Sequence, residues 1–177
     1  MTRVGFGYDS HRFAAGRPLV LGGVRVEHPA GLAGHSDADA VLHAVTDAIL
    51  GAAGAGDIGE HFPDADPRWR NVDSAVFVLH AVALARKAGL RAANCDVTIL
   101  CEAPRLSSYK AAMRAHLAEL LGVGRAQVGV KAKTNEGMGW IGRGEGMAAY
   151  AVVLLEGEKK RTKKRPASSP RRRGRKV

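Results

Sequence analysis

An aspartate and a histidine stand two residues apart near the N-terminus, at Asp9 and His11. Residues two apart in an extended segment point to the same face, so the two side chains can reach one point in space. A carboxylate and an imidazole are both ligands of Zn²⁺. The spacing therefore indicates a metal-ligand pair, with a salt-linked surface pair as the alternative. A metal site here needs a third ligand.

His43 is the candidate for that third ligand. It lies in a segment with helical periodicity, where a histidine usually has only a packing role. Asp39 and Asp47 lie four residues away on either side, and carboxylates one turn away could orient a ligand histidine. Ligands of the Asp, His, His type would leave one position of a tetrahedral Zn²⁺ open, as in catalytic rather than structural zinc sites.

A candidate phosphate site precedes this helix, in residues 34–39. The N-terminus of a helix offers free backbone N–H groups and the positive end of the helix dipole, which favour an anion. His35 and Ser36 add side-chain donors there. A plain helix cap, with Ser36 as the N-cap residue, is the alternative.

The segment from Asp57 to Asp66 is polar and long for a loop in so small a domain. Long loops of this kind are often functional. Its three aspartates, with Asp64 between the two ends, could bind sugar hydroxyls or water around a cation. Simple solvation of an acidic loop is the alternative.

A glycine-rich stretch covers residues 131–146, with five glycines in its last ten residues. Glycine lets the backbone approach a ligand closely. Lys133, Thr134 and Arg143 can donate hydrogen bonds to phosphate oxygens. Glu136 is a hard carboxylate ligand suited to Mg²⁺. The glycine spacing fits neither a P-loop nor a dinucleotide-binding turn, and a flexible loop is the alternative.

The segments that position these residues alternate between strand and helix patterns. Strand patterns cover residues 2–8, 18–26, 95–101, 128–133 and 147–155. Helical patterns cover residues 37–53, 74–88 and 108–121. Glycines mark a tight hairpin turn at residues 22–23 and end the last two helices, and Asp73 is placed as the N-cap of the second. We predict an α+β fold in two layers, with helices on one face of a small mixed sheet of four or five strands, plus a short β-hairpin.

The charge of the chain is concentrated at its C-terminus. Residues 158–177 hold 11 of the 27 Lys and Arg residues but only one of the 17 Asp and Glu residues, so residues 1–157 hold 16 of each sign. We therefore predict one neutral catalytic domain over residues 1–157 and a disordered basic tail over residues 158–177. Such a tail could bind an acidic partner through phosphate groups, or could simply be a solvated extension.

The composition and the first residues of the chain also indicate its cellular location. No apolar run reaches the roughly 18 residues needed to span a bilayer, and the first residues lack the pattern of a secretory signal. Cys95 and Cys101 are expected as reduced thiols rather than as a disulfide framework. We expect a cytoplasmic protein that does not enter a membrane.

Beyond these separate signals, the sequence resembles the 2-C-methylerythritol 2,4-cyclodiphosphate synthase family over nearly all of residues 2–156. The matching blocks are Gly-Tyr-Asp-Ser-His-Arg-Phe (7–13), His-Ser-Asp-Ala-Asp-Ala-Val-Leu-His-Ala-Val-Thr-Asp-Ala-Ile-Leu-Gly-Ala (35–52), Gly-Asp-Ile-Gly (56–59) with Phe-Pro-Asp-Ala-Asp (62–66), and Lys-Thr-Asn-Glu-Gly-Met-Gly (133–139) with Gly-Arg-Gly-Glu-Gly (142–146). Several blocks in the right order are far more specific than any one of them.

The resemblance implies a lyase of non-mevalonate isoprenoid precursor biosynthesis. It would convert 4-diphosphocytidyl-2-C-methylerythritol 2-phosphate into 2-C-methylerythritol 2,4-cyclodiphosphate and CMP. The 2-phosphate of the substrate would attack the β-phosphorus in line, so the enzyme would only position a folded-back substrate and neutralise charge with two cations. The lack of a Ser-His-Asp or Cys-His signature agrees with this expectation.

The resemblance also implies the metal ligands and the assembly. Asp9, His11 and His43 would hold Zn²⁺, for which Mn²⁺ or Co²⁺ could substitute. Glu136 would contact a Mg²⁺ or Mn²⁺ that bridges the α and β phosphates. A homotrimer would place the active sites between neighbouring subunits, and an isoprenoid diphosphate could bind at the trimer axis through Arg143.

For the substrate, the resemblance implies that His35 and Thr134 stabilise the transition state while Ser36 holds phosphate. Residues 57–66 would line the methylerythritol pocket, and residues 101–107 would receive cytidine. The implied substrate-binding residues are Ser36, Asp57, Ile58, Gly59, Phe62, Pro63, Asp64, Ala65, Asp66, Ala103, Pro104, Arg105, Leu106, Lys133, Asn135, Trp140 and Arg143. The sequence departs from many relatives at Arg105, where they have lysine, and at Trp140, where they have phenylalanine.

Two other function classes stay open at this stage. A metal-dependent phosphoester hydrolase could use the same ligands, with a metal-bound water as its nucleophile and a linear phosphate as its product. A nucleic-acid-binding protein could act through the basic tail, in which case deletion of residues 158–177 would abolish binding and leave a folded neutral core.

Overall fold

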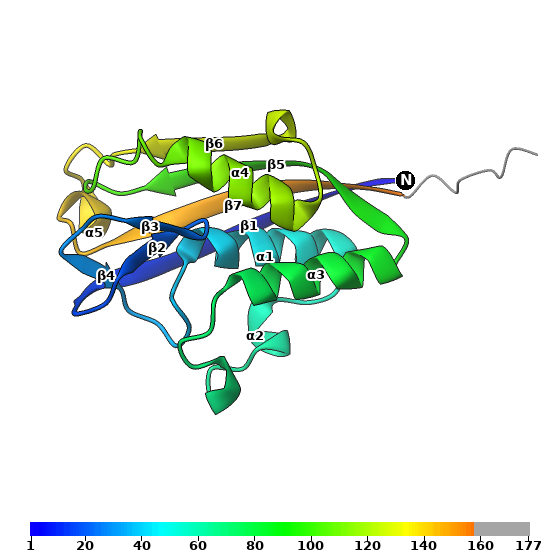
Figure 1. Cartoon of the computed structure of the whole chain (residues 1–177), viewed down its shortest axis with the longest axis horizontal. Coiled ribbons are helices and arrows are strands. Elements are labelled where there is room, and N and C mark those ends of the chain that lie inside the picture. The colour runs from blue at the N-terminus through cyan, green and yellow to red at the C-terminus, as the bar shows by residue number, and fades with distance from the viewer. Residues whose placement is uncertain (158–177) are drawn as a thin grey trace, which may run out of the picture.

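The computed structural model of the chain describes residues 1–157, and the predicted basic tail lies outside this range (Figure 1). A mixed five-stranded sheet has the strand order β4-β1-β7-β5-β6, in which only β5 and β6 are parallel. The bounds of its strands are Thr2–Ala15 (β1), Ala30–Leu32 (β4), Leu90–Leu100 (β5), Val128–Lys133 (β6) and Gly146–Gly157 (β7). A separate hairpin pairs β2 (Leu19–Leu21) with β3 (Val24–Val26) across Gly22 and Gly23, as predicted.

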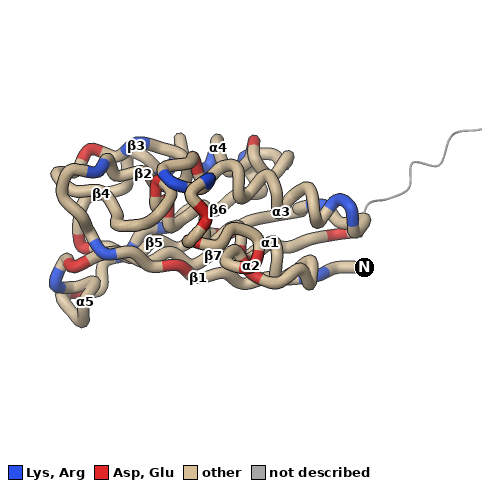
Figure 2. The backbone as a smooth tube through the Cα atoms, turned by 90° about the horizontal axis from the view of Figure 1, so that it is seen from below, with Lys and Arg blue, Asp and Glu red and all other residues tan. Residues whose placement is uncertain are grey.

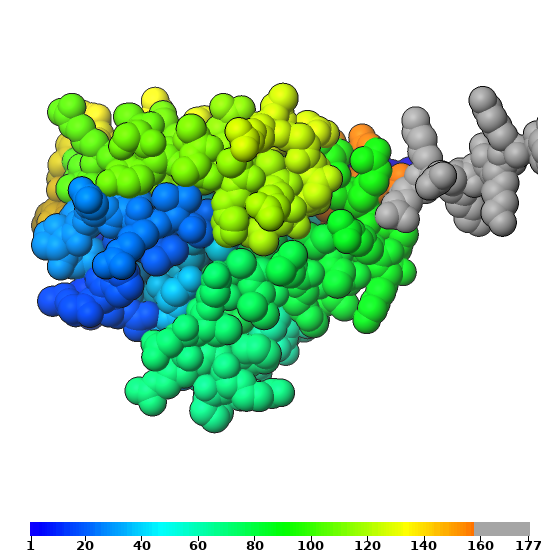
Figure 3. Space-filling view, viewed as in Figure 1, coloured from blue at the N-terminus to red at the C-terminus, as the bar shows by residue number. Residues whose placement is uncertain are grey.

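Three long helices pack on one face of the sheet. They are α1 (Ala40–Ala53), α3 (Ala75–Lys87) and α4 (Lys110–Leu121). The short elements are α2 (Ile58–His61), η1 (Pro67–Trp69), η2 (Arg125–Gln127) and α5 (Gly139–Gly142). The α2–η1 segment projects from the body beneath α1 and α3 (Figures 1 and 3). The prediction of an α+β fold in two layers is therefore confirmed.

Two glycines of β1 set the position of α1 over the sheet. A Cβ atom at Gly5 would lie 1.8 Å from the carbonyl oxygen of Ala48, and one at Gly7 would lie 1.9 Å from that of Ala44. Only glycine permits so close an approach of strand and helix backbones. The face of β1 that carries Asp9 and His11 is thereby held directly against the helix that carries His43.

The other face of the sheet carries exposed apolar side chains. Val4, Phe6 and Tyr8 alternate along β1, and their cross-strand partners on β7 are Leu154, Val152 and Tyr150. Phe6 is 63% exposed and Tyr8 is 44% exposed. Charged residues of both signs are interspersed over the rest of the described chain (Figure 2). The apolar strip on β1 and β7 is therefore a surface that a partner could cover.

The first helix begins later than predicted. Ser36 is not its N-cap, because Ala38 has a left-handed φ of 59° that no helical residue adopts, and α1 starts at Ala40. Asp39 is the N-cap residue instead, and its carboxylate accepts hydrogen bonds from Val41 N and Leu42 N. The same carboxylate accepts from Gly22 N at 2.8 Å and Gly23 N at 2.7 Å, which ties the hairpin to the helix.

Other element boundaries shift by a few residues. The first strand runs to Ala15 rather than residue 8, because the long antiparallel pairing with β7 continues to Arg12 and that with β4 to Ala15. The N-cap residue of α3 is Ser74 rather than Asp73, although the Asp73 carboxylate accepts from Ala75 N at 2.8 Å. Within the described chain, no helix is long and apolar enough to span a membrane, and both cysteines are buried free thiols.

Candidate metal and ligand-binding site

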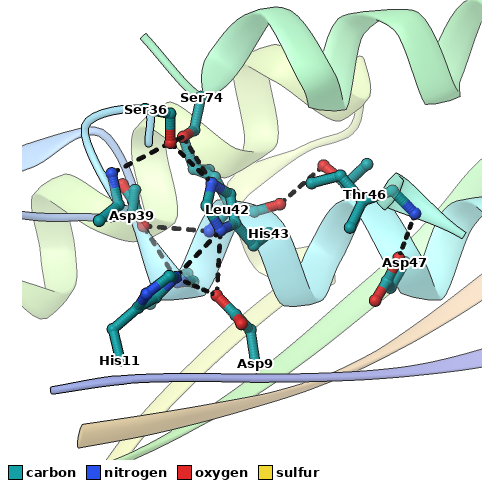
Figure 4. A network of polar contacts seen from close by, with 12 residues as sticks. Asp9, His11, Ser36, Asp39, Leu42, His43, Thr46, Asp47 and Ser74 are labelled. Carbon is teal, nitrogen blue, oxygen red and sulfur yellow. Dashed lines mark hydrogen bonds and ion pairs between the residues drawn. The ribbon is translucent and has the colours of Figure 1, made fainter. Parts of the chain in front are cut away.

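Asp9, His11 and His43 come together at the junction of β1 and α1 (Figure 4). Asp9 Oδ2 lies 2.9 Å from His11 Nε2 and 3.0 Å from His43 Nδ1, and the two imidazole nitrogens are 3.3 Å apart. Ligand bonds of about 2.0–2.1 Å in a tetrahedral site place ligand atoms about 3.3 Å from one another. The three side chains therefore form a group able to hold a metal ion with little rearrangement.

Contacts within this group outweigh the effect of partial burial on the pKa of Asp9 and on that of His11. Burial by itself would raise the pKa of Asp9, but hydrogen bonds to His11 and His43 and the charges of these rings outweigh it and hold the pKa well below its ordinary value. Burial would lower the pKa of His11, but the hydrogen bond and charge of Asp9 raise it above 6.5. When neither imidazole carries its proton on the nitrogen that faces Asp9, all three atoms are acceptors, and a metal ion between them would take the place of the protons.

The outer contacts of His43 differ from the prediction. Asp39 and Asp47 do not orient the ring: Asp39 accepts from backbone N–H groups, and Asp47 accepts from Ile58 N at 2.8 Å. Both carboxylates accept hydrogen bonds from backbone N–H groups that would otherwise have no partner. The Nε2 atom of His43 instead faces Ser74 Oγ at 2.9 Å and Ser36 Oγ at 3.1 Å.

A cavity of about 240 Å³ opens over the metal-binding group. Two of its lining residues, His35 and Trp69, carry a buried ring nitrogen that has no hydrogen-bond partner among the described residues, His35 Nε2 and Trp69 Nε1. Buried polar atoms are normally hydrogen-bonded, so these two atoms are available to a ligand or water. The lining residues are Asp9, His11, Gly34, His35, Ser36, His43, Ile58, Gly59, Phe62, Asp64, Trp69 and Phe77.

The predicted loop at 57–66 contributes only in part to this cavity. Its lining residues from this segment are Ile58, Gly59, Phe62 and Asp64. Asp57, Pro63, Ala65 and Asp66 are not among them. The carboxylate of Asp57 caps α2, and that of Asp66 caps η1 and pairs with Arg68 at 2.5 Å. Asp64 is thus the aspartate of this segment that faces the cavity.

A second cavity, of about 350 Å³, lies where β5 and β6 end side by side. Parallel pairing of Leu100 with Lys133 brings the two following segments together, and Cys101 N donates to Lys133 O at 3.1 Å. Ala103 and Asn135 are predicted site residues outside its lining. The lining residues are Cys101, Glu102, Pro104, Arg105, Leu106, Ser107, Ala132, Lys133 and Thr134.

Glu102 organises the loop beside this second cavity, a role that the sequence did not reveal. Its Oε1 atom accepts from Asn135 N at 2.7 Å and from Gly137 N at 3.3 Å. These two donors flank Glu136, which has a left-handed φ of 52°. Thr134 Oγ1 donates to Glu136 Oε1 at 2.7 Å, so Glu102 holds the backbone on which both predicted site residues stand.

The remaining predicted residues lie near α5. Trp140 lines a third cavity, of about 600 Å³. The other lining residues are Glu145 and residues 10–13 of β1, which include His11. Arg143 is exposed and donates through Nε to Glu145 at 2.6 Å. His11 therefore lies between the metal cavity and the third cavity, whereas Arg143 lines none of the three cavities described above.

Phe62 was predicted from the sequence as a site residue, but Trp69 and Phe77, which complete an aromatic wall of the metal cavity, were not. Phe62 packs against Phe77 and Trp69 with ring centroids 4.4 and 5.0 Å apart. Three of the nine aromatic residues of the chain lie between positions 62 and 77. That concentration was the available signal, because aromatic residues in a polar loop need an apolar surface to cover.

Comparison with known proteins identifies the family of this chain. The family model for the YgbB family matches residues 2–156. A curated 2-C-methyl-D-erythritol 2,4-cyclodiphosphate synthase from Geobacillus kaustophilus is 56% identical over 156 residues, which cover 88% of this chain and 99% of that protein.

Solved structures of proteins with the same name share the fold. One is 42% identical, with a TM-score of 0.81, and the match covers 87% of this chain and all of that one. Another, described as a form with bound CDP, is 40% identical with a TM-score of 0.80 over the same shares of both chains. The match in sequence and fold over nearly the whole described domain places this chain in the YgbB family of 2-C-methyl-D-erythritol 2,4-cyclodiphosphate synthases.

Proposed function

We propose that this protein converts 4-diphosphocytidyl-2-C-methyl-D-erythritol 2-phosphate into 2-C-methyl-D-erythritol 2,4-cyclodiphosphate and CMP, as a step of non-mevalonate isoprenoid precursor biosynthesis. The observation that carries the proposal is the Asp9, His11 and His43 group at the floor of a cavity, in a chain 56% identical to a curated synthase of that name. In this reaction the 2-phosphate oxygen forms a bond to the β-phosphorus while the bond to the CMP oxygen breaks. The substrate thus supplies both nucleophile and leaving group.

Zn²⁺ is the metal that the donor set fits best. Two imidazole nitrogens and one carboxylate oxygen are typical zinc ligands, and three protein ligands leave one coordination position open. Bound there, Zn²⁺ would neutralise and orient phosphate oxygens. Glu136 is exposed in the loop between β6 and α5, where its carboxylate would suit a Mg²⁺ or Mn²⁺ shared with the diphosphate.

The residues of the chain would bind, orient and shield the substrate. His35 and Ser36 line the metal cavity, where the imidazole and the hydroxyl would donate to phosphate oxygens. Asp64 and the backbone at Ile58 and Gly59 would receive the methylerythritol hydroxyls. The aromatic wall next to them would exclude water from the reacting groups.

The second cavity is the proposed nucleotide site. Its walls come from residues 101–107 and from Lys133 and Thr134, and a relative 40% identical is described with bound CDP. Main-chain groups of residues 101–107 would receive cytosine. Lys133 and Thr134 would donate to the phosphates, with Thr134 also placed to stabilise charge in the transition state.

A homotrimer would join the two cavities, which a single chain keeps separate. The exposed apolar strip on β1 and β7 is the proposed contact between subunits, because burial of Phe6, Tyr8 and Val152 would remove apolar surface from water. Each active site would then combine the metal cavity of one subunit with the nucleotide cavity of its neighbour. Arg143 would lie toward the trimer axis, where it could bind an isoprenoid diphosphate. The basic tail remains a candidate for acidic partners.

The experiment that tests this proposal is ³¹P NMR of the protein incubated with the cytidine substrate, Zn²⁺ and Mg²⁺. We expect the resonances of a cyclic diphosphate and of CMP in equal amounts. Linear phosphates would favour the hydrolase alternative, because water rather than the 2-phosphate would then be the nucleophile. An unchanged spectrum would reject both reactions.

A further inference from the structure

A buried serine, Ser74, stands behind His43, on the side away from the metal-binding group (Figure 4). Ser74 in turn contacts the carboxylate of Asp37. His43 Nε2 lies 2.9 Å from Ser74 Oγ, and Ser74 Oγ lies 2.5 Å from Asp37 Oδ1. Ser74 is completely buried. The three groups form a continuous chain from the metal-facing ring to a carboxylate.

The direction of each hydrogen bond follows from the chemistry of its groups. A carboxylate only accepts, so the single hydroxyl proton of Ser74 goes to Asp37. The oxygen of Ser74 is then left as an acceptor, and His43 must supply a proton from Nε2. When Nε2 carries the proton of the neutral ring, the lone pair of Nδ1 faces Asp9 and His11, where a metal ion would bind.

We propose that Asp37 and Ser74 are positioning residues of the metal site, which act through His43 by fixing its tautomer and its ring orientation for metal binding. This inference rests on the proposed function, since it takes the Asp9, His11 and His43 group to hold Zn²⁺. Partners of this kind, on the second nitrogen of a ligand histidine, strengthen metal binding because they raise the basicity of the ring. Here one hydroxyl group stands between the imidazole and the carboxylate.

Ser36 has a different place in this network. Its oxygen is 3.1 Å from His43 Nε2 and also accepts from Ala38 N at 3.1 Å, but no carboxylate takes its proton. The hydroxyl proton of Ser36 is therefore free to donate to Ser74, which lies 3.2 Å away, or to a ligand in the cavity. Ser74 is thus the better acceptor for His43, and Ser36 stays available to the substrate.

The chain is built to hold Asp37 and Ser74 together. Ser74 N donates to Asp37 Oδ2 at 3.2 Å, and Asp37 N donates to Val72 O at 3.1 Å. Asn71 N donates to the carbonyl of His35 at 2.8 Å. These bonds join the segment before α1 to the segment before α3, so the orientation of the metal ligand is coupled to the segment that carries His35 and Ser36.

The test is the dissociation constant for Zn²⁺, measured by chelator competition on the full chain for the wild type, Ser74→Ala and Asp37→Asn. We expect one Zn²⁺ per chain in the wild type and an affinity about tenfold weaker in Ser74→Ala, within the range of about 10- to 100-fold for such partners. The loss should lie toward the lower end because Ser36 can still accept from His43. Asp37→Asn should also bind more weakly, since its amide accepts from Ser74 without a negative charge.

Thr46→Ala is the matched control. It removes a completely buried hydroxyl from α1, the helix that carries His43. This hydroxyl donates to Leu42 O at 2.8 Å and makes no hydrogen bond to the His43 ring (Figure 4). Its Zn²⁺ affinity should stay within about twofold of the wild type, even if its metal-free form unfolds at a lower temperature.

The outcomes separate the inference from the function on which it rests. If Ser74→Ala and Asp37→Asn bind Zn²⁺ as tightly as the wild type, the positioning role is rejected while the zinc site stands. If Ser74→Ala does not fold, Asp37→Asn decides alone, and unchanged affinity in that variant rejects the role. If the wild type itself binds no Zn²⁺, the proposed metal site fails and the inference fails with it.

Discussion

At the scale of single residues, the metal-binding group depends on side chains from three segments: Asp9 and His11 on β1, His43 on α1, and Ser74 just before α3. The two-residue spacing of Asp9 and His11 predicted a shared face, and the structure confirms that His43 joins them. Asp39 and Asp47 were expected to orient His43, but their carboxylates accept hydrogen bonds from backbone N–H groups instead. The actual support, Ser74, lies 31 residues away in the sequence, and no local periodicity connects the two positions.

The role of Glu102 is a second property that only the structure reveals, and it predicts a kinetic effect. Glu102→Ala should lower kcat by about tenfold, because Glu136 and Thr134 lose the two backbone hydrogen bonds that hold their loop. Glu102→Gln should keep most of the activity, since its amide oxygen can still accept. Steady-state kinetics at several Mg²⁺ concentrations measure both variants. Glu119→Ala, an exposed change on α4, is the control, and equal loss in all three variants would contradict the argument.

At the scale of elements, the sequence predicted the long strands and helices but not their ends. The start of α1 shows why. The segment before it combines a serine turn at Ser36 with a left-handed Ala38, and Ser36 and Asp37 are also hydrogen-bonded to Ser74. The short strand β4 was also missed, because its three residues pair only through β1. Tertiary contacts decide such boundaries, whereas local patterns decide that the element exists.

The close approach of β1 and α1 predicts a large effect for Gly7→Ala. The added methyl group would lie 1.9 Å from the carbonyl oxygen of Ala44, so the helix would have to move away from the strand. We expect a loss of about 3 kcal/mol in the free energy of unfolding, at the upper end for overpacking, together with weaker metal binding.

Gly51→Ala is the matched control for that variant, because a Cβ atom at this position of α1 meets nothing within 4 Å. Alanine in a helix should instead stabilise the protein by about 0.5–1 kcal/mol. Urea unfolding of both variants provides the comparison, and a similar stability for Gly7→Ala and the wild type would show that the strand–helix contact is not as tight as described.

The cap of α1 predicts a dependence of stability on pH. Burial raises the pKa of Asp39 from 3.8 to about 6, although backbone N–H groups of Gly23, Leu42 and Gly22 oppose the shift. A carboxyl group whose pKa is raised in the folded state binds its proton more tightly there than in the unfolded chain. Its contribution to stability is therefore complete below about pH 4 and is lost as the pH rises through about 6.

Asp39→Asn tests this dependence because an amide has no proton to lose. Between pH 4 and pH 6 the free energy of unfolding of the wild type should decrease relative to that of Asp39→Asn, as measured by urea titration at each pH. Parallel curves for the two proteins would show that the pKa of Asp39 does not change on folding.

At the scale of the whole molecule, assembly was implied by the resemblance and could not be predicted from any single segment. Alternation along β1 leaves Phe6 and Tyr8 exposed on the face away from the helices, next to Val152 and Tyr150 of β7. Only the strand order, with β1 beside β7, gathers these side chains into one strip. The same order keeps the metal cavity and the nucleotide cavity apart in a single chain.

The proposed trimer contact predicts the effect of a charge placed on this strip. Phe6→Glu should give a folded monomer with little activity, because three carboxylates at a shared interface would be costly to bury. Light scattering and CMP release measure the two properties. Val76→Glu is the control, because it puts the same charge on an apolar residue of α3 that is 41% exposed. It should leave the assembly state and the activity unchanged. A trimeric, active Phe6→Glu protein would exclude this surface as the contact.

The central claim is that the Asp9, His11 and His43 group supports the cyclisation by holding a metal ion. The most direct test is to add Zn²⁺ stepwise to chelator-treated protein, in the presence of Mg²⁺ and substrate, and to follow CMP release in the wild type and His43→Ala. We predict activity that rises with Zn²⁺, reaches a plateau at one ion per chain and is lower by at least about 100-fold in His43→Ala. Full activity of the chelator-treated wild type, or of His43→Ala, would contradict the account.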